Sequence, residues 1–376
     1  MRAVPEQWAG GRLTVDLGAL AGNWRRLRDL AAPAECAAVV KANAYGLGIE
    51  NVVPALVRAG CRTFFVALPA EGVRVRLAAP DATVYVLNGM QGLYEEGFWR
   101  EHGLQPVCGT ADEVDAADDA SLPFALHVDT GMNRLGLPVP EAERLAASRL
   151  REGMEITLVM THFASADDRD HPMTARQHEA FRQVANRFPG VRRSAPNSAA
   201  TLARLGPSDL ARPGVAIYGA EALNGEPPLD PVVTLEGRVV QLREAARGET
   251  VGYGAAVTLT RPTRIAVVSV GYADGYPRAA SGAGVPMRFV TGGSRGFVRG
   301  RHVPVLGRVS MDLTAFDVTD APDVARGDWI EMFGSNVPID EVARAAGTIG
   351  YELLTALGRR HARRYVGDRP QVEGEQ

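Results

Sequence analysis

An alternation of helix-like segments and short apolar runs constrains the fold of this chain more than any other feature of its sequence. Amphipathic segments such as residues 16–31 and 174–188 are separated by apolar runs of strand length. Eight such runs fall between residues 16 and 215: Cys36–Lys41, Thr63–Leu68, Thr83–Asn88, Leu104–Cys108, Phe124–Asp129, Ile156–His162, Arg193–Asn197 and Asp209–Arg212. Eight β/α units in roughly 200 residues are typical of a (β/α)8 barrel. We therefore predict this α/β fold for residues 12–234, with the last two strands assigned partly to complete the count.

The sequence changes character near residue 235, which predicts a second, mostly β domain over residues 235–376. Runs of β-forming residues separated by Gly, Pro and Asp indicate strands joined by turns, at 233–242, 263–270, 287–291, 296–300 and 313–319. A helical pattern lies near residues 339–346. The proline-rich segment 224–231 is the candidate linker, and we leave open that residues 1–11 add a strand to the second domain.

Charge and cysteine content narrow the class of protein. The net charge is −3 and the arginines are scattered, so neither nucleic acid nor an anionic membrane is an expected partner. Cys36, Cys61 and Cys108 lack metal-type spacing and indicate free thiols in a reducing compartment. The N-terminus has no apolar leader, and no run is long enough to span a bilayer. We expect a cytoplasmic globular protein.

Polar residues follow the predicted barrel strands repeatedly and at the same end. The carboxyl ends of the strands carry the catalytic groups of such barrels. The residues at these positions are Lys41, His127, Asp129, His162, Asn197, Ser198 and Arg212. Any one of them is ordinary, because strands commonly finish in a polar residue. Together they predict one site at the carboxyl end of the barrel.

Lys41 is the only lysine of the chain, and the other 40 of the 41 basic residues are arginine. Arginine can replace lysine as a surface charge, but its guanidinium stays protonated and cannot attack a carbon. A single lysine at the end of an apolar run therefore indicates amine chemistry. The alternative is a chance survivor in an arginine-biased composition.

Nine motifs in order give the chain a resemblance to alanine racemases, the fold-type III family of pyridoxal-phosphate enzymes. They are V-D-L-G-A-L (15–20), V-V-K-A-N-A-Y-G-L-G (39–48), D-T-G-M-N-R-L-G (129–136), T-H-F-A (161–164), N-S-A-A (197–200), R-P-G-V-A-I-Y-G (212–219), V-G-Y-G-A (251–255), G-Y-A-D-G-Y-P-R (271–278) and S-M-D (310–312). The resemblance continues to G-T-I-G-Y-E (347–352) and so covers nearly the full length. It implies a racemase that interconverts L- and D-alanine with pyridoxal 5'-phosphate.

The resemblance also assigns the residues that hold the cofactor. Lys41 looks like the Schiff-base lysine that bonds covalently to it. The residues matching the phosphate contacts are Tyr45, Ser198, Gly214, Val215 and Tyr351. Arg212 matches the residue facing the pyridine nitrogen, where a permanent positive charge disfavours ring protonation and transamination. From the residues alone, Y-G-L-G and R-P-G are ordinary turns, and Arg212 could equally pair with a carboxylate.

Racemisation needs two bases flanking the substrate Cα, and the resemblance implies Lys41 and Tyr253. Tyr253 would reach the cofactor of the other subunit, which implies a homodimer with composite sites. His162 and Arg212 would be linked to it by hydrogen bonds, and nearby positive charge favours a phenolate. The implied substrate residues are Arg134, Met311 and Tyr272, with Asp312 as structural support. Without the family, Tyr253 would be read as a packing residue.

Three positions depart from the family pattern. Many members have a carbamylated lysine where this chain has His127, so we expect His127 or a bound anion to orient Arg134 instead. Ser310 replaces the usual cysteine before Met-Asp, and R-H-A-R (360–363) replaces an R-V-P-R-like element near the dimer edge.

Other functions remain as alternatives. Residues 162–171 contain His162, Asp167, Asp168, Asp170 and His171, but their spacing matches no known metal motif, and no metal is expected. A racemase of broader range, a fold-type III decarboxylase and a non-catalytic cofactor carrier share the barrel. V-G-Y-G-A argues against a decarboxylase and the second domain against a carrier. The sequence sets neither the substrate range nor a biosynthetic rather than catabolic role; the resemblance implies D-alanine for peptidoglycan.

Overall fold

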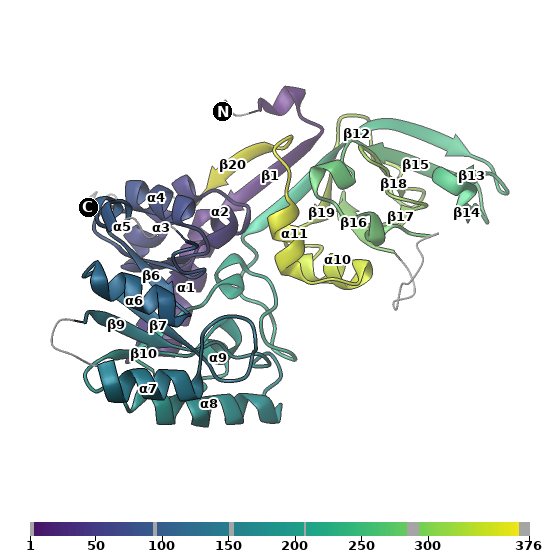
Figure 1. Ribbon diagram of the computed structural model, residues 1–376. Coiled ribbons are helices and arrows are strands. Elements are labelled where there is room, and N and C mark those ends of the chain that lie inside the picture. Colours follow the sequence, from purple (N-terminus) through teal and green to yellow (C-terminus); the bar gives the residue numbers. More distant parts are fainter. Residues whose placement is uncertain (1–3, 93–95, 150–153, 207, 284–292, 368–376) are drawn as a thin grey trace, which may run out of the picture. The chain divides into compact units, whose positions relative to one another are not determined.

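Eight parallel strands form a barrel in the N-terminal part of the chain (Figure 1). The computed structural model describes residues 4–92, 96–149, 154–206, 208–283 and 293–367. The first strand is interrupted at Ala37, so that it comprises β2 and β3. The strands in chain order are β2 (Glu35–Cys36) with β3 (Ala38–Val39), β4 (Thr63–Val66), β5 (Thr83–Val86), β6 (Leu104–Cys108), β7 (Phe124–Asp129), β9 (Ile156–Met160), β10 (Arg192–Ser194) and β11 (Leu210–Ala211). All eight predicted strands are therefore confirmed.

Backbone hydrogen bonds close these strands into a ring. One ladder runs in the order β10-β9-β7-β6-β5-β4-β3, and β11 pairs in parallel with β2. The gap between β10 and β11 is bridged by the N–H groups of Asp209 and Arg212, which donate to the carbonyls of Arg193 and Pro196 at 2.9 Å each. β4 is buried at all four positions, as expected for a strand covered on both faces.

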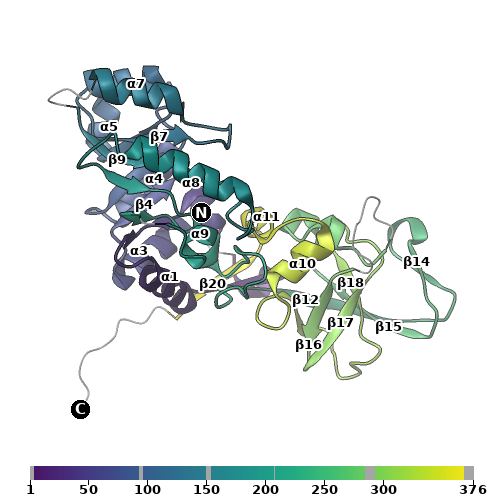
Figure 2. The same ribbon diagram turned by 90° about the horizontal axis from the view of Figure 1, so that it is seen from below.

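Helices follow most of the barrel strands along the chain. They are α1 (Leu17–Ala31), α2 (Lys41–Tyr45), α3 (Ile49–Ala59), α4 (Pro69–Ala78), α5 (Glu96–His102), α6 (Ala111–Asp119), α7 (Val139–Arg149), α8 (Pro172–Ala185), α9 (Ser198–Leu202) and the 3-10 turn η2 (Val215–Tyr218); the short strand β8 (Leu137–Pro138) pairs with β7. α7 and α8 lie side by side in both views (Figures 1 and 2). α3 buries Ile49, Val52 and Leu56 at helical spacing, which fixes its inner face.

The C-terminal part of the chain forms a mostly antiparallel sheet that closes on itself. Its order is β15-β18-β17-β16-β19-β12-β1-β20, and β15 also pairs with β12. The strands are β1 (Gly11–Asp16), β12 (Val233–Ala245), β15 (Thr263–Val268), β16 (Arg295–Val298), β17 (Arg301–Leu306), β18 (Thr314–Asp317), β19 (Trp329–Phe333) and β20 (Ala362–Val366), with a hairpin of β13 (Thr250–Val251) and β14 (Val257–Thr258). Helix α10 (Ile339–Ala346) confirms the predicted helical pattern, whereas β17, β19, β20 and α11 (Gly350–Ala356) were not predicted.

The boundary between the two units differs from the one predicted from the sequence. One unit comprises Leu20–Leu229, and the other comprises the residues up to Ala19 together with those from Asp230 onward. The barrel was predicted to begin at residue 12, but β1 pairs with β12 and β20 and therefore belongs to the C-terminal unit. The predicted strand at 287–291 lies outside the described residues. No helix within the described ranges is long and apolar enough to cross a bilayer.

Candidate active site

The carboxyl ends of the barrel strands gather the residues predicted to form the site. Lys41 follows β3, His127 lies in β7, and His162 follows β9. Ser198 opens α9 after β10, and Arg212 follows β11. Strands β3 and β9 end before the predicted residues 41 and 162, so Lys41 and His162 stand just beyond the ladder rather than inside it. Burial lowers the pKa of His162, and the positive charges of Arg212, Arg134 and Lys41 lower it further.

The Lys41 amine is set up to lose its proton. Burial lowers the pKa of Lys41 from its ordinary value, and the positive charge of Arg134 lowers it further. The carboxylate of Glu71 acts in the opposite direction and is the weakest of the three influences. A lowered pKa increases the share of the neutral, nucleophilic amine at any given pH. Lys41 can therefore form a covalent bond to a carbonyl carbon.

The residues after Lys41 form a left-handed turn. Ala42, Asn43, Ala44 and Tyr45 have φ between 52° and 57°, a region that costs L-residues other than Asn and Asp about 1–2 kcal/mol each. Tyr45 closes the turn and stacks on Tyr218, with ring centroids 4.5 Å apart. The sequence K-A-N-A-Y does not predict this conformation, whereas four consecutive glycines would have indicated it.

Three elements converge on a small polar cradle beside Tyr45. The hydroxyl of Ser198 accepts hydrogen bonds from the backbone N–H groups of Gly214, at 2.8 Å, and Ala216, at 3.3 Å. A Cβ atom at Gly214 would lie 2.4 Å from the Tyr45 hydroxyl oxygen, so only glycine leaves this space open. Two hydroxyl groups beside backbone N–H groups are suited to a phosphate. The residues present therefore fit the phosphate of a pyridoxal cofactor.

Replacing Gly214 by alanine is expected to weaken cofactor binding about tenfold or more, because the added methyl displaces the Tyr45 hydroxyl and overpacking of this kind costs about 1–3 kcal/mol. Spectroscopic titration of the apoprotein with pyridoxal phosphate measures the effect. Gly22→Ala is the matched control, because a Cβ there meets nothing within 4 Å. Equal cofactor affinity in the two variants would contradict the assignment of the cradle.

Arg212 is a buried guanidinium that pairs with neutral groups. It is 3% exposed; Nη1 donates to the Ser194 hydroxyl and Nη2 donates to the carbonyl of Thr161 at 2.6 Å. Burial lowers the pKa of Arg212 to about 9, which leaves it protonated at neutral pH. Among the described residues no carboxylate forms an ion pair with it, so the alternative of a strand-end salt bridge is wrong. A fixed positive charge of this kind suits the pyridine nitrogen.

Two histidines near Arg212 are held neutral. Burial, followed by the charge of Arg212, lowers the pKa of His127 to about 4 and that of His162 to about 3. Neutral His127 carries no negative charge of its own, so it cannot reproduce the charge of a carbamate beside Arg134. Arg134 itself is exposed.

Gln177, which the sequence analysis did not single out, and Asp129, which it placed at the end of a barrel strand, shape the loops of the site. Gln177, fully buried on α8, donates to the Thr130 hydroxyl at 3.3 Å and to the His162 carbonyl at 3.0 Å, and it accepts from the Ala164 N–H at 2.9 Å. One Oδ1 atom of Asp129 accepts three backbone N–H groups, from residues 131, 132 and 133. These contacts tie the Arg134 loop to the His162 loop. The available signal for Gln177 was a polar residue on the face of α8 that also buries Phe181 and Val184.

The other predicted residues belong to the C-terminal unit, where large side chains are exposed. Tyr253 is 71% exposed, Met311 53% and Tyr272 42%. The N–H of Tyr272 donates to the Ser310 carbonyl at 3.0 Å, so Tyr272 and Met311 lie on adjoining loops. Arg360, from the R-H-A-R element, pairs with Asp274 at 2.7 Å and with Asp312 at 2.8 Å. Asp312 is thus paired with Arg360, and its role as structural support stays a prediction.

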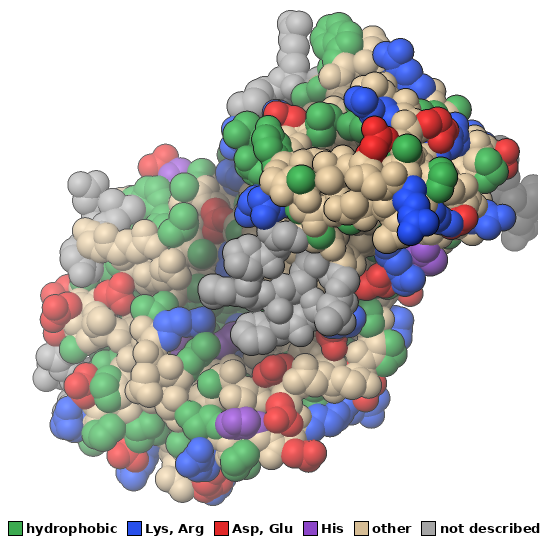
Figure 3. All heavy atoms as spheres, turned by 90° about the vertical axis from the view of Figure 1, so that its right-hand side faces the viewer, with side chains coloured by type: hydrophobic (Ala, Val, Ile, Leu, Met, Phe, Trp, Pro, Cys, Tyr) green, Lys and Arg blue, Asp and Glu red, His purple; other side chains and the backbone are tan. Residues whose placement is uncertain are grey.

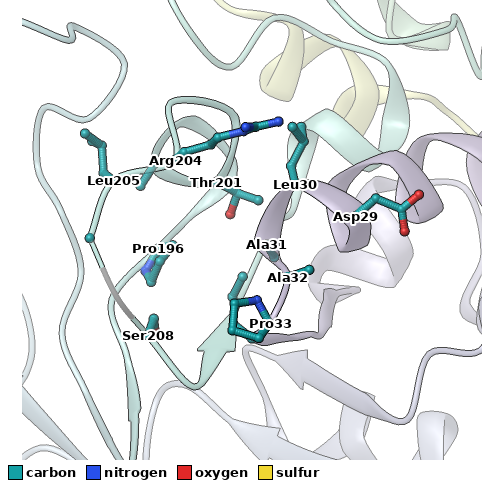
Figure 4. A pocket seen from close by; sticks show the side chains of 14 residues that line it. Asp29, Leu30, Ala31, Ala32, Pro33, Pro196, Thr201, Arg204, Leu205 and Ser208 are labelled. Carbon is teal, nitrogen blue, oxygen red and sulfur yellow. The ribbon is translucent and has the colours of Figure 1, made fainter.

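A cavity of about 380 Å³ lies elsewhere in the barrel unit, lined by the end of α1 and by the chain around α9 (Figure 4). None of the predicted site residues lines it. In the segment considered as a metal site, His171 instead caps α8 by accepting the Met173 N–H at 3.2 Å. On the face shown in Figure 3, acidic and basic side chains are interspersed, unlike the uniformly basic surface of nucleic-acid-binding proteins.

Comparison with known proteins matches both units. The model of the alanine racemase N-terminal domain matches residues 15–222, and that of the C-terminal domain matches residues 232–365. The chain is 50% identical over 369 residues to the biosynthetic alanine racemase of Agrobacterium fabrum, covering 94% of this chain and 93% of that one. It is 42% identical over 372 residues to the catabolic alanine racemase of Rhizobium johnstonii, covering 96% of each.

Solved structures agree in fold over the same length. The alanine racemase of Bartonella henselae with covalently bound pyridoxal phosphate is 36% identical, with a TM-score of 0.86, and the match covers 95% of this chain and all of that one. The biosynthetic alanine racemase of Pseudomonas aeruginosa is 38% identical, with a TM-score of 0.87, covering 95% and 99% respectively.

Proposed function

The chain belongs to the alanine racemase family and is a pyridoxal-phosphate-dependent alanine racemase, and we propose that Lys41 and Tyr253 are the two bases that exchange the Cα proton of alanine. One observation carries the assignment of Lys41. The only lysine of the chain stands at the carboxyl end of a barrel strand with its pKa lowered by burial. It is also joined by the short turn 42–45 to Tyr45, which lies beside the phosphate cradle.

The cofactor would make the substrate proton acidic, and the protein would bind the cofactor and supply the bases. When bound, pyridoxal phosphate withdraws electrons from the substrate Cα and so makes its proton acidic. Lys41 would bond the cofactor covalently, while Tyr45, Ser198 and the backbone at 214–215 would hold its phosphate, with Tyr351 as a further contact. As a free amine, Lys41 would act as a base toward the substrate Cα.

Inversion requires a proton to leave one face of Cα and another to arrive on the opposite face. Lys41 serves one face, and which base removes the proton depends on the enantiomer. We propose that Tyr253 comes from a second subunit, so that the active enzyme is a homodimer with composite sites. The 71% exposure of Tyr253 in a single chain supports this role, because an aromatic ring so exposed is suited to an interface. Tyr272 and Met311 would line the entrance.

Arg212 controls which reaction follows proton removal. Its positive charge makes protonation of the pyridine nitrogen unfavourable, since the guanidinium remains charged at neutral pH. Arg212 would in this way favour return of the proton to Cα, which completes racemisation. The absence of a carboxylate partner for Arg212 among the described residues supports this assignment.

Activity is expected to be independent of bicarbonate. Carbamylation needs a lysine amine, and position 127, the matching position, is occupied by a histidine. We propose that Arg134 holds the substrate carboxylate through its guanidinium fork, oriented by His127 or a small anion. Racemisation rates measured in CO2-free buffer with and without added bicarbonate should agree within experimental error. A severalfold stimulation by bicarbonate would contradict this proposal.

The function itself is tested by following single L-amino acids with circular dichroism. Decay of the signal to zero for alanine, with slow or absent decay for serine and larger side chains, is the expected result. Decay of the signal for many amino acids would instead indicate a racemase of broad substrate range. If the signal does not decay although the protein carries cofactor on Lys41, the remaining alternatives are a decarboxylase and a non-catalytic cofactor carrier. We further propose that the enzyme is cytoplasmic and supplies D-alanine for peptidoglycan.

A further inference from the structure

The left-handed turn that follows Lys41 is held by side chains from another helix. Four consecutive residues, 42–45, have positive φ, although none of them is glycine. Asparagine tolerates this region, but alanine and tyrosine do not favour it. The conformation therefore depends on contacts from its surroundings. Because Lys41 precedes the turn and Tyr45 closes it, whatever holds the turn also fixes both of these residues.

Glu71 and Arg74, on the first turn of α4 and just after it, make those contacts. One oxygen of the Glu71 carboxylate accepts the Asn43 N–H at 3.1 Å. A guanidinium nitrogen of Arg74 donates to the Asn43 side-chain oxygen at 2.6 Å, and that same oxygen accepts the Ile49 N–H at 3.2 Å. Arg74 is itself oriented by Glu50, through bonds of 2.8 and 2.9 Å. The backbone and the side chain of Asn43 are thus both bound from α4.

We propose that Glu71 and Arg74 are positioning residues that fix Lys41 and Tyr45 by holding the turn between them. The inference rests on the roles proposed above for Lys41 and Tyr45. Glu71 also raises the pKa of Lys41 against the effect of burial, so its charge bears on the amine directly.

The simplest competing explanation gives Glu71 a purely local role. Its second carboxylate oxygen accepts the N–H groups of Ala67 at 3.0 Å and Leu68 at 3.2 Å, which caps the start of α4. Capping would explain that oxygen alone. It explains neither the bond to Asn43 nor the bond that Arg74 makes to the same residue.

The same helix supplies a matched control. Arg76 donates to the carbonyls of Pro80, Ala82, His102 and Gly103, and within the described part of the chain it forms no hydrogen bond to the turn. Removing it deletes more hydrogen bonds than removing Arg74. A loss of stability unrelated to the turn should therefore be at least as large in Arg76→Met as in Arg74→Met.

The experiment compares Glu71→Gln, Arg74→Met and Arg76→Met with the wild-type protein. Three quantities are measured: the dissociation constant for pyridoxal phosphate, the pH midpoint of the absorption change of the bound cofactor, and the thermal midpoint of the apoprotein. We expect Glu71→Gln and Arg74→Met to weaken cofactor binding about tenfold or more, as for the loss of a hydrogen bond to a charged group. Glu71→Gln should also move the pH midpoint downward, because the lost carboxylate favours the protonated form of the Lys41 nitrogen. Arg76→Met should lower only the thermal midpoint.

The inference would be overturned if Glu71→Gln and Arg74→Met both bound the cofactor with an affinity within twofold of wild type and Glu71→Gln left the pH midpoint unchanged. Arg74→Lys covers the case in which the larger changes unfold the protein. Lysine keeps the charge and the aliphatic stem, but it cannot bond Asn43 and Glu50 as the planar guanidinium does. We therefore expect a severalfold loss of cofactor affinity in Arg74→Lys, and an unchanged affinity would contradict the inference. Borohydride reduction and peptide mapping of the wild type separate the two hypotheses. If the cofactor is not found on Lys41, the proposed function is contradicted. If it is found on Lys41 but Glu71→Gln and Arg74→Met bind the cofactor as the wild type does, only this inference is contradicted.

Discussion

Lys41→Arg is expected to abolish racemisation, with kcat falling on the order of 10⁴-fold or more. The substitution removes both the nucleophile that bonds the cofactor and one of the two bases, and general base catalysis alone contributes about 10²–10⁴-fold. Arginine preserves the positive charge and the length of the side chain but does not deprotonate at neutral pH. The measurement is the rate of loss of optical activity of L-alanine by the purified variant, supplemented with excess cofactor.

The uniqueness of Lys41 makes the control unusually clean. Borohydride reduction of the Lys41→Arg variant should yield no cofactor-bearing peptide, because no other lysine exists in the chain. Arg28→Lys introduces a second lysine at an exposed position paired with Asp29, and it should carry no cofactor and leave activity unchanged. Appreciable racemisation by Lys41→Arg would refute the role of Lys41 in both steps.

Tyr253→Phe is expected to lower racemisation about 10³-fold while cofactor binding is preserved, since only one of the two bases is lost. The variant should keep Lys41 on its own face of Cα. In D2O, one enantiomer of alanine should therefore exchange its Cα proton without inversion, whereas the other should exchange at least about a hundredfold more slowly. NMR measures the exchange and circular dichroism the inversion.

Tyr351→Phe provides the comparison, because it removes the hydroxyl of another exposed tyrosine of the same unit. Tyr351, 36% exposed, is proposed to contact the cofactor phosphate, so its loss should raise the dissociation constant of the cofactor without making proton exchange asymmetric. Near-normal turnover by Tyr253→Phe, or equal loss of exchange for both enantiomers, would exclude the two-base assignment.

Much of the architecture follows from the sequence because it depends on local patterns. The runs Thr63–Val66 and Phe124–Asp129 were predicted as strands because short, mostly apolar runs suit parallel strands that are covered on both faces. The carboxyl ends of parallel strands necessarily meet at one end of the barrel, so the sequence alone predicts that Lys41, His162 and Arg212 belong to one site. The single lysine and its position at the end of an apolar run predicted amine chemistry at position 41.

Other features were decided only by contacts between residues far apart in the chain. Strand β1 joins the C-terminal sheet because its partners are β12 and β20, more than 200 residues away in the sequence, and no local pattern reveals a partner. The barrel closes through β2 and β11, each two residues long and too short to carry a periodic signal. Arg212 was ambiguous in the sequence, and only its burial without a carboxylate partner among the described residues resolved that ambiguity.

In the turn after Lys41, the sequence determines which chemical groups are present and the tertiary structure determines their conformation. The sequence K-A-N-A-Y determines that an amine and a phenol lie four residues apart, and it makes a left-handed conformation unfavourable. Contacts from Glu71 and Arg74, some 30 residues along the chain, accompany that conformation in the folded protein. The chemical groups were therefore fixed by the sequence, whereas their geometry was fixed by hydrogen bonds that exist only once α4 has packed beside the turn.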